Sequence, residues 1–81
     1  MVKVVTIHEL KIAPCYYEEV ITYRKTFEIR KNDRDFQIGD SVLLMEYVNG
    51  EYTGRSVMVK ITYLTDYEQK KGYCVFSISP V

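Results

Sequence analysis

Apolar and polar residues alternate along most of this chain, as they do in strands with one buried face. Segments of this kind, rich in β-branched and aromatic residues, predict five strands, at residues 4–12, 25–31, 41–48, 56–64 and 73–79. Asn49-Gly50 separates two of these segments and is the strongest short hairpin signal in the chain. The pattern therefore predicts a sheet whose third and fourth strands form a hairpin.

One segment follows a helical period instead. From Pro14 to about Tyr23, the residues Tyr17, Val20 and Ile21 recur at i, i+3 and i+4 and form a narrow apolar stripe. Pro14 fits the first turn of a helix because its missing N–H would be unpaired there anyway. A helix this short is stable only when it is docked, so we expect its stripe to face the sheet.

The two-residue period also assigns side chains to faces. In the second strand it places Phe27 and Ile29 on the core face, and Thr26, Glu28 and Arg30 on the other. That second set forms either a ladder in solvent or one side of a binding site.

In the fourth strand the period groups Tyr63 with Val57, Val59 and Ile61. The third strand has apolar residues on both faces and is expected to be buried on both sides. His8 shares a face with apolar neighbours in the first strand, where a half-buried and hydrogen-bonded histidine is expected.

Five strands and one helix in 81 residues cannot cover both faces of an open sheet. Curling the sheet removes most of its exposed edges. We therefore expect an α+β, mainly β fold: a small five-stranded, partly closed β-barrel with one short helix between strands one and two. At this length, residues 1–81 are expected to form a single domain.

Charge narrows the possible partners. Eleven Lys and Arg residues balance eleven Asp and Glu residues, which argues against an unspecific grip on duplex nucleic acid. Residues 24–34, in contrast, hold five cations and two anions, so a local basic patch is possible. The eight tyrosines are mostly expected at the rim of the core, although those of the C-terminal half could present a stacking surface on the sheet.

Other chemistry receives little support. Cys15 and Cys74 are expected to be reduced and packed, and a single histidine without a C-x-x-C motif predicts no structural zinc. No cofactor is expected. Residues 1–7 lack the apolar region of a signal peptide, and no run approaches the roughly 20 apolar residues that span a membrane. We therefore expect a cytoplasmic protein that has no membrane partner.

Lys25, Glu28 and Arg30 are spaced as K-x-x-E-x-R and are followed by F-x-x-G-D at residues 36–40. This arrangement after a short helix resembles the ASCH domain of the PUA-like superfamily, and in particular a compact ASCH-like family of phage and bacterial genomes. The matching pieces are residues 8–12, 25–34, 52–55 and 61–63. Tyr23 is a departure from the pattern, because ASCH domains have G-x-K at residues 23–25.

The resemblance implies a cleft near Lys25, Glu28 and Arg30 that binds RNA or a nucleotide. Glutamate can accept hydrogen bonds from the amino groups of bases, and arginine can stack on rings or bind phosphate. The candidate ligand-binding residues are Lys25, Thr26, Glu28 and Arg30, with Lys11, Lys31 and Arg34 adding phosphate contacts. From the period alone, a solvated ladder of ion pairs is the competing interpretation.

Two alternatives stay open. Some small ASCH-like proteins are amidohydrolases that act on N4-acylated cytidines, and they resemble this chain at Lys25. They carry a threonine nucleophile three residues later, where this chain has Glu28, which weakens the enzyme hypothesis. In an enzyme, Lys25 would activate a nucleophile and Glu28 would assist. The second alternative is a protein-interaction domain that uses the tyrosine-rich sheet.

Overall fold

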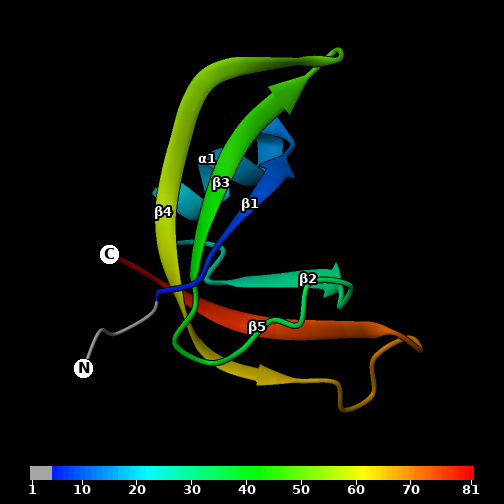
Figure 1. Ribbon diagram of the computed structural model, residues 1–81. Coiled ribbons are helices and arrows are strands. Elements are labelled where there is room, and N and C mark those ends of the chain that lie inside the picture. Colours follow the sequence, from blue (N-terminus) through cyan, green and yellow to red (C-terminus); the bar gives the residue numbers. More distant parts are fainter. Residues whose placement is uncertain (1–4) are drawn as a thin grey trace.

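The computed structural model describes residues 5–81 and shows five strands and one helix (Figure 1). Their bounds are β1 Ile7–Ile12, α1 Pro14–Ile21, β2 Phe27–Lys31, β3 Ser41–Val48, β4 Glu51–Thr65 and β5 Tyr73–Pro80. The strands form one mixed sheet that curls into a half-barrel, so the mainly β fold with a helix between strands one and two is confirmed. The predicted start of the first strand, Val4, lies outside the described residues.

The sheet has the strand order β1-β3-β4-β5-β2. β1 runs parallel to β3, and the other neighbours are antiparallel. The Asn49-Gly50 turn joins β3 to β4, with φ angles of 53° and 80°, as a type I′ turn requires. β4 is long enough to pair with β3 along its first part and with β5 along its last, so this one strand carries the curl of the sheet (Figure 1).

The core fills the space between the concave face of the sheet and α1. Its members are Leu10, Ile12, Tyr17, Val20, Phe36, Val42, Leu44, Val59, Ile61, Cys74, Phe76 and Ile78. The predicted stripe of α1 is confirmed, because Tyr17 and Val20 are buried and Ile21 packs against the core. In β3, one face is buried as predicted, whereas Leu43 and Met45 on the other face are only half-buried.

The helix ends at Ile21, two residues before the predicted position, in a Schellman motif. The amide of Arg24 donates to the carbonyl of Glu19, and the amide of Tyr23 donates to the carbonyl of Val20. Tyr23 has a φ of 61°, a conformation that usually belongs to glycine at this position. The tyrosine therefore imposes local strain at the end of α1.

The predicted facing of β2 is wrong. Glu28 is only 4% exposed, whereas Phe27 is 42% and Ile29 52% exposed. Glu28 lies opposite Phe76 of β5, a core residue, and directly paired residues share a face. Two cationic side chains approach the Glu28 carboxylate, which offsets the cost of burying its charge. That compensation reverses the order that hydrophobicity alone predicts.

The predicted facing of Tyr63 is also wrong, because β4 contains a bulge. Ile61 lies opposite Ile78 and Tyr63 lies opposite Ser77, so Thr62 is an extra residue between two consecutive pairs. The extra residue shifts the alternation by one position. Tyr63 is therefore 59% exposed, and Leu64 takes the inward position opposite Phe76.

Arginine side chains cover the edge of β1. Arg30 of β2 donates to the carbonyl of Lys11 at 2.9 Å, and Arg34 donates to the carbonyl of Glu9 at 2.8 Å. β1 and β2 are the outer strands of the sheet, so Arg30 links its two edges. Covering the polar groups of an edge strand limits its pairing with other chains.

Three smaller expectations have mixed outcomes. His8 is more deeply buried than expected, and its Nε2 lies 2.8 Å from Oδ2 of Asp40, so the ring is hydrogen-bonded as predicted. Both cysteines are free thiols, with Cys74 buried as predicted and Cys15 exposed, contrary to the prediction that both are packed. Within residues 5–81, no helix has the length and apolar character needed to cross a membrane.

Candidate functional site

The candidate site is built around the carboxylate of Glu28 on β2. Oε1 lies 3.0 Å from Nζ of Lys25, and Oε2 accepts a hydrogen bond from Nε of Arg30 at 3.3 Å. Lys25 stands in the segment between α1 and β2, three residues before the glutamate, and Arg30 lies two residues after it on the same face of the strand. The spacing read from the sequence therefore does bring the three side chains together.

The hydrogen bonding of this carboxylate is incomplete. Nζ of Lys25 donates to the carbonyl of Phe27 at 2.7 Å and forms an ion pair with Oε1 at 3.0 Å. Among residues 5–81, no donor makes a hydrogen bond to Oε1, although that atom is buried. Nearly all buried polar atoms in proteins have a partner, and leaving one unpaired is costly. Oε1 of Glu28 is therefore held by the nearby charge of Lys25, without an aligned donor from residues 5–81.

A cleft of about 270 Å³ lies beside this carboxylate. Its lining residues come from the end of β1, the first turn of α1 and the middle of β2: Lys11, Ile12, Ala13, Tyr16, Glu28, Ile29 and Arg30. Tyr16 is exposed at one side, and its ring centroid is 5.7 Å from Nζ of Lys25. The cleft thus combines a buried acceptor, an aromatic ring and cationic groups.

Of the other predicted site residues, Lys11 lines the cleft and the rest lie farther out. Thr26 is exposed and lines a second, mostly apolar groove of about 260 Å³ beside the C-terminal end of α1, and Lys25 lines that groove as well. Lys31 is exposed at the end of β2. Arg34 covers the edge of β1, and Lys11 lies with Nζ 4.4 Å from the ring centroid of Tyr47. Tyr16 and Ile29 belong to the cleft, and sequence reasoning did not select them.

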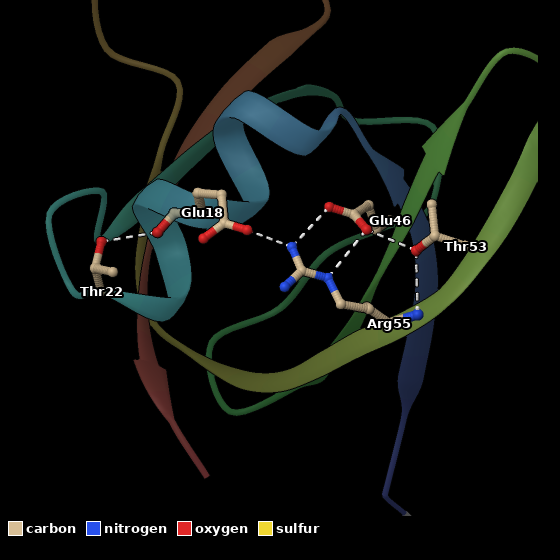
Figure 2. A network of polar contacts seen from close by, with 5 residues as sticks. All are labelled: Glu18, Thr22, Glu46, Thr53 and Arg55. Atoms are coloured by element: carbon tan, nitrogen blue, oxygen red, sulfur yellow. Dashed lines mark hydrogen bonds and ion pairs between the residues drawn. The ribbon is translucent and has the colours of Figure 1, made fainter.

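A second buried carboxylate, Glu46 of β3, was also missed by sequence reasoning (Figure 2). Nε of Arg55 donates to its Oε1 at 3.1 Å and Nη2 to its Oε2 at 3.0 Å, while the Thr53 hydroxyl donates to Oε1 at 2.6 Å. Nη2 of Arg55 also reaches Glu18 on α1. The signal in the sequence was a single acidic residue inside the apolar run of β3.

This network shifts the pKa values of its members. Hydrogen bonds from Arg55 and Thr53 lower the pKa of the Glu46 carboxyl, and hydrogen bonds to Glu46 and Glu18 raise the pKa of Arg55. The guanidinium also lies 4.6 Å from the ring centroid of Tyr17. Both oxygens of Glu46 thus have an aligned donor. Because Arg55 also contacts Glu18, the network ties α1 to the β3–β4 hairpin (Figure 2).

Metal binding is not indicated by the side chains. Within the part of the chain that the structure describes, no three His, Cys, Asp or Glu side chains gather closely enough to hold an ion.

Together, the curled five-stranded sheet, the docked helix and the Lys–Glu–Arg cluster around a buried carboxylate define a small half-barrel class of protein. The family model of DUF3850, a domain of unknown function, matches residues 7–78, and the chain belongs to that family. A relative is the "Uncharacterized 12.9 kDa protein in GpA 3'region" of Escherichia phage P2, which is 43% identical over 60 residues. The match covers 74% of this chain and 55% of the phage protein, so the chain spans about half the length of that relative.

Proposed function

We propose that the protein binds RNA or a nucleotide in the cleft beside Glu28. The observation that carries the proposal is the buried carboxylate of Glu28, a residue that lines the cleft and whose Oε1 has no aligned donor from residues 5–81. A carboxylate held in this state accepts a hydrogen bond from the exocyclic amino group of a base. The resemblance of K-x-x-E-x-R to the ASCH motif supports the same choice of ligand, and the cytoplasm is the proposed compartment.

The cleft suits a single base. Its volume of about 270 Å³ is close to the lower end of the ~300–1,000 Å³ typical of small-molecule sites. An amino group at Oε1 of Glu28 would leave the base near Tyr16 and Ile29, which offer a ring and an aliphatic surface. The cationic groups of Lys11 and Arg30 also line the cleft, where they can contact the phosphate.

The first experiment compares Glu28→Gln with the unaltered protein. Fluorescently labelled RNA, both single-stranded and hairpin, and cytidine 5′-monophosphate are titrated at low and moderate salt. We expect Glu28→Gln to weaken binding about tenfold or more, because a hydrogen bond to a charged acceptor is lost. Affinity equal to that of the unaltered protein would contradict the proposal.

The matched control is Glu51→Gln, which makes the same charge change at an exposed position beside the Asn49-Gly50 turn. It is expected to keep the affinity unchanged. The loss of one acidic charge would by itself strengthen binding to RNA, so equal losses of affinity in both variants would contradict a specific role of the cleft.

The hydrolase alternative is tested with the same protein preparation. N4-acetylcytidine is incubated with it, and the ultraviolet spectrum is followed with Lys25→Ala as the comparison. Turnover that disappears in Lys25→Ala would replace the binding proposal by an amidohydrolase. Binding without turnover is the expected result, because Glu28 occupies the position of the threonine nucleophile in the ASCH-like enzymes.

A further inference from the structure

The outward face of β2, β5 and the last part of β4 carries two exposed aromatic rings in one row. Phe27 of β2 pairs with Ser77 of β5, and Ser77 pairs with Tyr63 of β4. The three side chains therefore point to the same side of the sheet, which Figure 1 shows as three neighbouring strands. We call Phe27, Ser77 and Tyr63 the Phe27–Tyr63 row. The row beside it on the same face consists of Ile29, Val75 and Thr65.

Both rings are outside for unusual reasons. Phe27 is exposed because the charged residue Glu28 takes the inward position, and Tyr63 is exposed because a bulge at Thr62 reverses the alternation. Bulges are frequent next to functional sites, where they redirect a side chain. Positions at which local sequence rules fail are often functional. Two independent departures place aromatic rings in the same row.

The row has a shape that suits a flat ring. Neighbouring strands lie about 4.8 Å apart, so the Cα atoms of Phe27 and Tyr63 are about 10 Å apart with the small Ser77 between them. Two exposed rings thus flank a small residue in this row. Bases stack on aromatic side chains of sheet surfaces in this way, largely independently of sequence.

The charges on this face complement a phosphate backbone. Lys31 lies at one end of the face on β2, and Lys60, opposite Ser79, lies at the other. Nζ of Lys70 is 5.6 Å from the ring centroid of Tyr73, which pairs with Lys31. Among the described outward residues of these paired strands, none is acidic.

The row is continuous with the Glu28 cleft. Ile29 lines the cleft and belongs to the neighbouring row, and Nζ of Lys25 lies 4.9 Å from the ring centroid of Phe27 and 3.0 Å from Glu28. We propose that a single-stranded nucleic acid leaves the cleft across β2 and stacks a base between Phe27 and Tyr63. This inference rests on the proposed function, and it assigns the partner as a strand rather than a free nucleotide.

The test separates the row from the cleft. Tyr63→Ala, Tyr63→Phe and Glu28→Gln are titrated with cytidine 5′-monophosphate and with labelled single-stranded RNA and DNA of about eight nucleotides. We expect Tyr63→Ala to bind the oligonucleotides about tenfold more weakly and the mononucleotide unchanged, and Tyr63→Phe to retain affinity because the ring remains. Val48→Ala, which truncates an exposed apolar side chain at the end of β3, is the control and keeps full affinity.

Each outcome has one interpretation. If Tyr63→Ala does not affect oligonucleotide binding while Glu28→Gln weakens it, the stacking row is wrong and the cleft stands. If Tyr63→Ala weakens binding and Glu28→Gln does not, the row stands and the cleft proposal fails. RNA bound more tightly than DNA identifies a contact with the 2′-hydroxyl. The inference would be overturned if the unaltered protein bound no oligonucleotide and formed oligomers that dissociate in Phe27→Ala. That result would show that the face is a protein interface.

Discussion

Two glutamates are buried in this small half-barrel, and they are satisfied in very different ways. Glu46 is 5% exposed and receives aligned hydrogen bonds on both oxygens, from Arg55 and Thr53. Glu28 is 4% exposed and lies near two cations, yet its Oε1 has no aligned donor among residues 5–81. Burial alone therefore does not describe how a carboxylate is held, because one of these two is fully hydrogen-bonded and the other is not.

The difference arises from where the cations point. Arg55 directs two nitrogens at Glu46 in the bidentate geometry that makes such pairs strong. Lys25 and Arg30 each give part of their hydrogen bonding to a backbone carbonyl, of Phe27 and Lys11 respectively. Their positive charge makes burial of Glu28 tolerable, while Nε of Arg30 makes the one aligned hydrogen bond that the carboxylate receives from residues 5–81. Such an arrangement keeps a buried acceptor in place without saturating it.

Removing Arg55 is expected to lower the stability of the protein more than any other substitution proposed here. Arg55→Met keeps a long side chain but removes the guanidinium from Tyr17 and leaves Glu46 as a buried charge without its bidentate partner, which is severely destabilising. We expect the melting temperature to fall by about 10 °C or more in a thermal scan followed by circular dichroism. Arg55→Lys should recover part of the loss. An unchanged melting temperature would mean that the network of Figure 2 does not hold α1 on the hairpin.

A matched pair of substitutions, Glu46→Gln and Glu28→Gln, tests whether the two carboxylates differ in role. Glu46→Gln removes charged hydrogen bonds that stabilise the fold, so we expect its melting temperature near neutral pH to fall by roughly 5–10 °C. Glu28→Gln removes a charge that the fold satisfies only in part, so a change of no more than about 3 °C is expected. Equal losses in both variants would contradict the distinction.

The pH dependence of the melting temperature tests the role of Glu46 independently. The pKa of Glu46 is lowered in the folded state, so its stabilisation is present above the unfolded value of about 4.3 and is lost as the pH falls through the folded value. The melting temperature of the unaltered protein should therefore approach that of Glu46→Gln as the pH is lowered from about 7 to about 3. Carboxylates common to both proteins, such as Glu19 beside Arg24, cancel in this difference.

The sequence was sufficient to predict the strands and the helix, but it was insufficient to predict which way Tyr63 and Glu28 face. The strands, the helix and the Asn49-Gly50 hairpin depend on local periods and turn residues, which a single sequence contains. The outward position of Tyr63 depends on a bulge in the pairing of β4 with β5, which only the assembled sheet defines. The inward position of Glu28 depends on the core residue opposite it, Phe76 of a distant strand.

The candidate site was predictable in part for the same reason. The spacing of Lys25, Glu28 and Arg30 is local, and these side chains do meet around one carboxylate. The contribution of Tyr16 depends on how the first turn of α1 docks beside β2, which is not encoded locally. Glu46 was detectable as a lone acid in an apolar strand, but its partner Arg55 lies across the hairpin, nine residues later.

A further prediction concerns the end of α1, the helix that supplies Glu18 to one carboxylate network and Tyr16 to the surroundings of the other. Tyr23 closes this helix with a φ of 61°, which is strained for any residue with a Cβ. Tyr23→Gly relieves the strain but gains freedom in the unfolded chain, so we expect a net stabilisation of about 0.5–1 kcal/mol in urea unfolding. Tyr23→Ala, which removes the ring and keeps the strain, should give no gain.

The same substitution tests whether α1 supports the two carboxylates equally. If it does, Tyr23→Gly should raise the melting temperatures of Glu28→Gln and Glu46→Gln by the same few degrees. Unequal gains would show that α1 is coupled more strongly to one carboxylate.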